Sequence, residues 1–134
     1  PPPDPGGAEG ENSFGAHTDF GALTVLAQDA SGGFQIQADD GRWIDVPPVP
    51  GSFIVNLGDF VQRWTNDLYR STRHRVVSNG GHRYSVAAFY NGNPECAVEC
   101  IPECVAPGET ARYEPTTMVD YLQMRVREIS AATY

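Results

Sequence analysis

The sequence of 134 residues contains no lysine: all nine basic residues are arginine, and they stand against 17 acidic residues. The formal net charge of −8 argues against nucleic acid or an anionic membrane as the main partner, because both repel an acidic surface. No apolar run approaches the roughly 20 residues of a membrane-spanning helix, and no secretory signal is evident. With 40% hydrophobic and 19% charged residues, the composition is that of a globular protein.

Cysteine is scarce, and the three present are Cys96, Cys100 and Cys104. An odd number without a secretory segment favours a reducing, intracellular setting, so we expect a cytoplasmic protein. The even spacing allows a metal site as an alternative. However, Pro102 prevents a regular helix that would stack the thiols, and no further Cys or His completes a zinc site at the usual spacing. Ordinary strand and loop thiols are the favoured interpretation.

Several familiar catalytic motifs are missing. The sequence has no glycine-rich phosphate loop and no Gly-x-Ser-x-Gly nucleophile elbow, and its cysteines have no adjacent base. These absences argue against nucleotide-dependent transfer and against serine or cysteine hydrolase chemistry.

Glycine (14) and proline (11) are abundant, as in proteins with many short strands joined by turns. Strands are expected near Phe14 and over residues 23–26, 34–37, 42–46, 52–57, 73–78, 83–91 and 97–101. The most apolar of them, 52–57, is expected to be central. Regular strand spacing predicts an all-β sandwich or barrel with a minor helix, formed by residues 13–134 after a polar lead-in over residues 1–12.

Two helices are predicted from capping residues. Asp59 could cap a short helix over residues 60–64. Thr117 with Asp120 resembles a capping box and predicts a helix over about 117–131. Its apolar face would carry Val119, Leu122, Val126 and Ile129.

His17 and Asp19 are separated by one residue at the end of a predicted strand, so both side chains can point to the same side. His74 lies in a later strand that the fold can bring back beside them. Two His and one carboxylate on one face of an octahedron are typical of iron(II) in oxygen-activating enzymes. A zinc hydrolase is an alternative, although it usually needs a nearby general base. The third histidine, His82, fits an exposed turn.

Arg83 and Ser85 are also two residues apart on a predicted strand and would share one side. A guanidinium group is well suited to bidentate carboxylate binding, and a hydroxyl adds one more donor. An arginine paired with a surface acid is the alternative, but the strand continues as apolar residues, among which an arginine would need an anion. Phe89 on the same side could be a wall of the substrate pocket or a core aromatic residue.

Taken together, these features resemble the C-terminal, catalytic half of the isopenicillin N synthase-like 2-oxoglutarate and iron(II)-dependent oxygenases. The similar stretches are residues 15–26, 43–48, 56–59, 63–67, 70–76 and 83–85, and the resemblance covers most of residues 14–134. It implies a double-stranded β-helix, or jelly-roll, fold. It also implies that His17, Asp19 and His74 hold the iron, that Arg83 and Ser85 bind the far carboxylate of 2-oxoglutarate, and that Phe89 lines the substrate site.

The activity implied by this resemblance is hydroxylation or desaturation of a small organic molecule with O2, coupled to decarboxylation of 2-oxoglutarate to succinate. Two alternatives stay open: an iron(II) oxidase of the same family that does not use 2-oxoglutarate, and a non-catalytic jelly-roll binding module. Members of the family are longer, with an N-terminal helical region and a first core strand that would lie just before Pro1. We therefore expect the N-terminal region of the same longer chain to complete the fold.

Overall fold

The computed structural model describes residues 12–132. Its elements, in chain order, are β1 (Asn12–His17), β2 (Leu23–Gln28), β3 (Phe34–Gln37), β4 (Trp43–Asp45), β5 (Ile54–Leu57), α1 (Asp59–Trp64), β6 (His74–Val77), β7 (Ser85–Tyr90), β8 (Ala97–Val98), the 3₁₀ helix η1 (Pro102–Cys104), β9 (Thr116–Thr117) and α2 (Met118–Ala132). The lead-in predicted over residues 1–12 lies outside the described residues except for Asn12, which begins β1.

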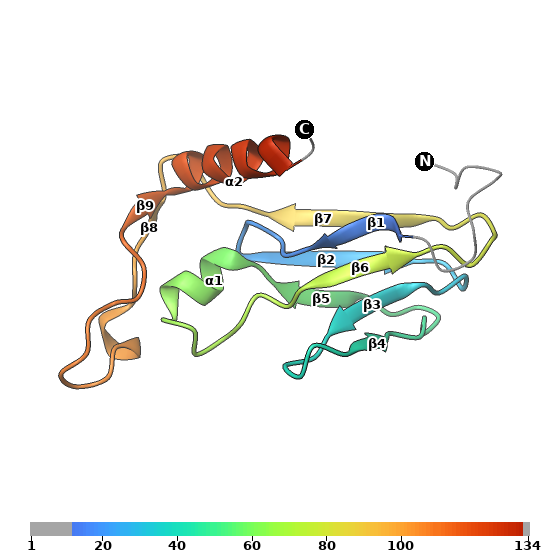
Figure 1. Cartoon of the computed structure of the whole chain (residues 1–134), viewed down its shortest axis with the longest axis horizontal. Helices are drawn as coiled ribbons and strands as arrows, with labels where there is room; N and C mark the ends of the chain where they lie inside the picture. The colour runs from blue at the N-terminus through green and yellow to red at the C-terminus, as the bar shows by residue number, and fades with distance from the viewer. Residues whose placement is uncertain (1–11, 133–134) are drawn as a thin grey trace. The chain divides into compact units, whose positions relative to one another are not determined.

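Four strands form one antiparallel sheet in the order β1-β6-β3-β4 (Figure 1). β6 lies between β1 and β3, so His74 is opposite His17 on one side and Ile36 on the other. β3 and β4 form the predicted hairpin, whose turn places Gly41 at a φ of 84°. A backbone φ in this range favours glycine, which explains the Asp-Asp-Gly sequence of the turn.

A second sheet has the order β5-β2-β7. β2 is therefore its central strand, and the expectation that residues 52–57 form the central strand is wrong. The reason is that apolar sequence did not mean burial here: Phe53 is 66% exposed and Val55 61% exposed. β7 ends the strand order on the other side, and all six of its residues are exposed.

The described chain forms two compact units. The first comprises residues 12–18, 25–56 and 72–88, and the second comprises residues 19–24, 57–71 and 89–132. The second unit contains a hydrophobic core that draws on the turn before β2, on α1, on β8 and on α2. Its buried members are Ala22, Phe60, Val98, Met118 and Tyr121.

The start of α2 confirms the predicted capping residues. The Thr117 hydroxyl accepts a hydrogen bond from the Asp120 N–H (3.2 Å) and donates one to the Asp120 carboxylate (2.6 Å). The buried side chains of this helix are Met118 and Tyr121, whereas Val126 is 51% exposed. The predicted apolar face is therefore not the one that packs on the core of the second unit.

The predicted cap of α1 is wrong. Gly58 occupies the N-cap position, and no side chain caps the helix. Asp59 is instead the first helical residue, and its carboxylate accepts a hydrogen bond from the Tyr121 hydroxyl (2.7 Å). Asp59 thus connects α1 to α2. Within residues 12–132, no helix has the length and hydropathy that crossing a bilayer requires.

Candidate metal centre

Two adjacent strands of the first unit bring the two predicted histidine ligands together. His17 ends β1, His74 begins β6, and the two are cross-strand partners. Their ring centroids lie 4.3 Å apart, with an angle of 61° between the ring planes. His74 is buried, and the ring of Phe34 lies 5.4 Å from its ring. Pairing of β1 with β6 therefore brings together two histidines that 56 residues separate in the sequence.

Backbone carbonyl groups fix the orientation of both imidazole rings. Nδ1 of His17 lies 2.8 Å from the carbonyl oxygen of Gly15, and Nδ1 of His74 lies 3.0 Å from that of Thr72. A carbonyl oxygen can only accept a hydrogen bond, so Nδ1 is the protonated nitrogen in each ring. The lone pair of each neutral imidazole is then on Nε2, which is the arrangement that metal-ligating histidines commonly have.

Asp19 supplies the carboxylate, two residues beyond His17 in the chain. Its side chain is 6% exposed, and Oδ2 accepts a hydrogen bond from the Thr24 hydroxyl (2.6 Å). One candidate ligand atom from each of His17, Asp19 and His74 lies within 4.8 Å of the others. Two neutral imidazoles and one carboxylate form a donor set that suits iron(II). The residues present therefore fit the metal that the sequence predicted.

Arg83 and Ser85 point toward each other in the first unit: Nη1 of Arg83 donates a hydrogen bond to the Ser85 hydroxyl oxygen (3.0 Å). Nε donates to the carbonyl oxygen of Gly32 (2.9 Å), and Nη2 donates to Oε1 of Gln28 (3.0 Å). Burial lowers the pKa of the Arg83 guanidinium, while the Asp29 carboxylate acts in the opposite direction. An arginine stays protonated under such shifts, so the group is a fixed cation bound to neutral oxygens.

Phe89, the predicted pocket wall, lies in β7 and is 59% exposed within the described part of the chain. Ser85 is exposed as well. The roles of Phe89, Arg83 and Ser85 in ligand binding stay predictions. His82 is exposed, as a turn residue should be.

The sequence analysis did not identify the residues that hydrogen-bond to the Asp19 carboxylate and the Arg83 guanidinium. Thr24 bonds to Asp19, and Gln28 and Gly32 bond to Arg83. A signal existed for Thr24, because it is a hydroxyl residue within the otherwise apolar run of residues 23–26. No local pattern points to Gln28 or Gly32, since their partner lies more than 50 residues away.

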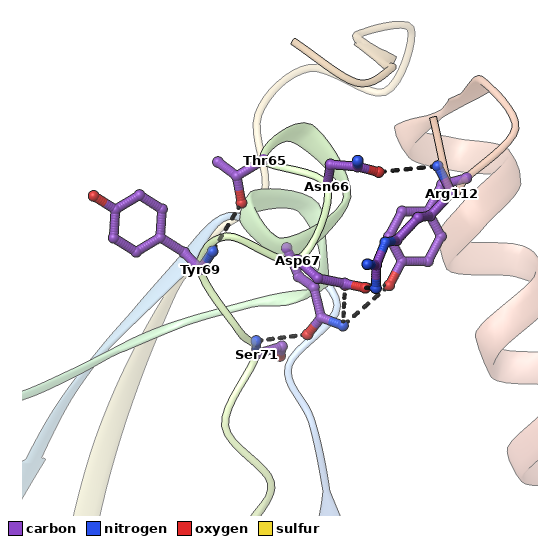
Figure 2. A network of polar contacts seen from close by, with 8 residues as sticks. Thr65, Asn66, Asp67, Tyr69, Ser71 and Arg112 are labelled. Carbon is purple, nitrogen blue, oxygen red and sulfur yellow. Dashed lines mark hydrogen bonds and ion pairs between the residues drawn. The ribbon is translucent and has the colours of Figure 1, made fainter. Parts of the chain in front are cut away.

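A second group of polar side chains lies in the second unit, around the turn after α1 (Figure 2). The Asp67 carboxylate accepts hydrogen bonds from the Tyr113 hydroxyl (2.5 Å), from Nε2 of Gln62 (2.9 Å) and from Nη1 of Arg112 (3.0 Å). Burial acts to raise the pKa of Asp67, but these hydrogen bonds outweigh it, so the pKa is lowered. Burial and the bond to Asp67 together raise the pKa of Tyr113.

The chain is similar in sequence to proteins of a known family. The 2OG-Fe(II) oxygenase superfamily model matches residues 1–92. The 2-oxoglutarate-Fe(II) type oxidoreductase hxnY of Emericella nidulans is 46% identical over 112 residues, which are 82% of this chain and 32% of that protein. Feruloyl CoA ortho-hydroxylase 1 of Arabidopsis thaliana is 41% identical over 85% of this chain and 32% of its own length.

Solved structures agree with the sequence relatives. A full-length protein of Neurospora crassa, solved in complex with alpha-KG and thymine, has a TM-score of 0.80 at 38% identity, over 92% of this chain and 38% of that chain. The dioxygenase for auxin oxidation from rice has a TM-score of 0.82 at 33% identity, over 90% of this chain and 42% of that chain. This chain thus spans about a third of the curated relatives named above.

Antiparallel sheets of the jelly-roll type that carry a His-x-Asp pair and a distant His define a class of non-haem metalloproteins. Within that class, this chain belongs to the 2OG-Fe(II) oxygenase superfamily. The family uses iron(II), 2-oxoglutarate and O2, as the resemblance implied. The predicted jelly-roll fold and the predicted family are confirmed.

Proposed function

We propose that this chain forms the catalytic region of an iron(II)- and 2-oxoglutarate-dependent oxygenase. The reaction is hydroxylation or desaturation of a small organic molecule, with decarboxylation of 2-oxoglutarate to succinate and carbon dioxide. The observation that carries the proposal is the group formed by His17, Asp19 and His74, whose ligand atoms lie within 4.8 Å of one another.

In this proposal the protein binds and orients, and iron(II) supplies the oxygen-activating chemistry when it is bound. His17 and His74 would hold the metal through Nε2, because their Nδ1 atoms donate to backbone carbonyls. Asp19 binds through its carboxylate, which has enough lone pairs to accept the Thr24 hydroxyl as well. Two imidazoles and one carboxylate are the protein ligands of many iron(II) sites that also bind a cosubstrate and O2, and these three residues would supply that set.

Arg83 would bind the far carboxylate of 2-oxoglutarate together with Ser85. A guanidinium has five N–H groups, and three of them serve Gly32, Ser85 and Gln28. These three bonds use Nε, Nη1 and Nη2 once each, so one N–H remains on each terminal nitrogen. Two such donors match the two oxygens of a carboxylate, and Arg83 is therefore suited to a bidentate contact.

The substrate is proposed only as a class. Two relatives bear names that refer to feruloyl CoA and scopoletin, one solved structure contains thymine, and another is named for auxin oxidation. These are small organic molecules of different shapes, and they support a small organic substrate here without choosing among them.

The test is a screen of small molecules by succinate release, with iron(II), 2-oxoglutarate and O2 supplied. We expect succinate release that depends on iron(II) and increases when the substrate is present. Product formation without succinate would replace the proposal by a 2-oxoglutarate-independent iron oxidase of the same family. Full folding with neither iron binding nor turnover would indicate a non-catalytic binding module.

We also propose that an N-terminal region of a longer chain completes this fold. Within residues 12–132, β7 ends the strand order of its sheet, and its residues are exposed, with Val86 74% and Tyr90 65% exposed. A strand edge with bare N–H and C=O groups normally receives a partner or a cover. A strand added beside β7 would pair with the backbone of this edge.

Amide hydrogen exchange tests this second proposal. The β7 amides should exchange quickly in the 134-residue chain and slowly in the longer protein, whereas the β6 amides should be protected in both, because β6 lies between β1 and β3. Equal β7 protection in the two proteins would contradict it.

A cytoplasmic location is proposed on the cysteines alone. Cys96, Cys100 and Cys104 are free thiols, which suits a reducing compartment. Cell fractionation tests this location, and recovery of the protein outside the cytoplasm would contradict it.

A further inference from the structure

The turn that carries Asp19, between β1 and β2, is held along its backbone by the start of α1. Its carbonyl oxygens accept hydrogen bonds from the first N–H groups of that helix, which have no partner inside the helix. The three pairs are Gly58 to Ala22 (2.9 Å), Asp59 to Asp19 (2.8 Å) and Phe60 to Gly21 (3.1 Å). Because no side chain caps α1, these carbonyl groups serve as its cap.

Two glycines allow the chain segments to approach this closely. A Cβ atom at Gly58 would overlap the carbonyl oxygen of Gly21 and lie 2.9 Å from that of Asp19. A Cβ atom at Gly21 would overlap the side chain of Asn91 and lie 2.9 Å from the carbonyl oxygen of Tyr90. The Asp19 backbone is thus fixed by contacts within the second unit, and only its side-chain torsions could vary.

Thr24 restricts those torsions. Its hydroxyl donates to Oδ2 of Asp19 at 2.6 Å, a length typical of a hydrogen bond to a carboxylate. Thr24 is 5% exposed and Asp19 is 6% exposed, so water competes little for this bond. Thr24 is β-branched and lies in the central strand β2, which limits its own side-chain rotation. A rigid donor therefore sets the plane of the carboxylate.

We propose that Thr24 is a positioning residue that holds the Asp19 carboxylate in the orientation that binds the metal. This inference rests on the proposed function, because it requires that Asp19 is a metal ligand. Outer partners of metal ligands contribute about 10–100-fold to metal affinity. Removal of the Thr24 hydroxyl should therefore weaken metal binding by roughly this factor.

The experiment is a cobalt(II) titration of the metal-free full-length protein, followed by visible absorption. Thr24→Val removes the hydroxyl with little change in size, and Thr24→Ser keeps it. Thr65→Val is the matched control, because Thr65 is also buried and its hydroxyl donates to the carbonyl oxygen of Val61 (2.7 Å). The same hydroxyl accepts a hydrogen bond from the Tyr69 N–H (Figure 2). Thr24→Cys, with a weak S–H donor, keeps the test possible if Thr24→Val does not fold.

We expect the cobalt(II) dissociation constant to rise about 10–100-fold in Thr24→Val, less in Thr24→Cys, and by no more than about threefold in Thr24→Ser and Thr65→Val. If the Val and Cys variants bind like the wild type, or if Thr65→Val weakens binding equally, the inference is overturned while the proposed metal site stands. A wild-type protein that binds no cobalt(II) would overturn the proposed metal site itself, and the role of Thr24 with it.

Discussion

Arg83 and Arg112 lie in different units, and their guanidinium groups differ in their hydrogen-bond partners. In the first unit, the hydrogen bonds of Arg83 all go to neutral oxygens, those of Gln28, Gly32 and Ser85. In the second unit, Arg112 donates to the Asp67 carboxylate at 3.0 Å. Its charge is thus matched by a hydrogen-bonded carboxylate, whereas the Asp29 carboxylate acts on Arg83 through its charge, and the described hydrogen bonds of Arg83 go to neutral oxygens.

Under the proposed function, this difference separates an arginine that would bind a ligand from one that stabilises the fold. Neutral acceptors orient the Arg83 guanidinium, and the Asp29 carboxylate acts on its pKa less strongly than burial does, so an added carboxylate would gain a hydrogen-bonded ionic contact that the described contacts of Arg83 do not supply. The region around Asp67 is already complete: Tyr113, Gln62 and Arg112 surround one carboxylate (Figure 2). Substitution of Arg83 should therefore alter the binding of 2-oxoglutarate, and substitutions around Asp67 should alter the free energy of unfolding.

The largest effect is expected for His74→Ala, which removes one of three proposed metal ligands. Metal affinity should fall by more than the roughly 10–100-fold that loss of an outer partner causes, and succinate release should fall with it. Iron content after gel filtration measures the first and a succinate assay the second. His82→Ala is the control, because His82 is exposed and outside the group. Equal iron in both variants would contradict the assignment.

The second-largest effect is expected for Arg83→Ala. The 2-oxoglutarate concentration needed for half-maximal succinate release should rise about 10–100-fold, because a hydrogen bond to a charged group is worth about 1.5–3 kcal/mol. Iron binding should be nearly unchanged. Arg83→Lys should recover only part of the loss, because an ammonium group cannot make the bidentate contact. The 2-oxoglutarate dependence of succinate release gives the measurement. Parallel loss of iron and 2-oxoglutarate binding would instead make Arg83 structural.

Asp67→Asn should lower the free energy of unfolding by about 1–3 kcal/mol, because it removes a charged acceptor of three hydrogen bonds. Asparagine suits the site otherwise, since Asp67 has a φ of 70° and asparagine tolerates this conformation. Urea denaturation measures the effect, with the exposed Asp40→Asn variant as control. A clear change in the 2-oxoglutarate requirement of Asp67→Asn would break the division between the two regions.

The smallest effect concerns pH. The pKa of Asp67 is lower in the folded protein than in the unfolded chain, where it is about 3.9. Its contribution to stability is therefore fully present above about pH 4 and is lost as the pH falls through the folded value. The stability difference between wild type and Asp67→Asn should be nearly constant from about pH 6 to pH 5 and should shrink below about pH 4. A difference that grows on acidification would show that the pKa is raised instead.

Local patterns predicted most of the strands, the hairpin turn at Gly41 and the Thr117–Asp120 capping pair, since each depends on neighbouring residues. The predictions that β5 is the central strand of its sheet and that Asp59 caps α1 were wrong. Strand order depends on distant partners, and the partners of α1 are carbonyl groups, which every residue has and no pattern reveals. The spacing of His17 and Asp19 was visible in the sequence; their nearness to His74 required the pairing of β1 with β6.

Binding of 2-oxoglutarate at both the iron and Arg83 is tested most directly by an anaerobic titration of the iron(II)-loaded full-length protein with 2-oxoglutarate, followed by the charge-transfer absorption of the chelated iron. We predict a saturable band at one 2-oxoglutarate per iron. The titration should shift to about 10–100-fold higher concentration in Arg83→Ala and stay unchanged in Arg112→Ala. A protein that holds iron without this band, or an Arg112→Ala variant that shifts as far as Arg83→Ala, would contradict this prediction.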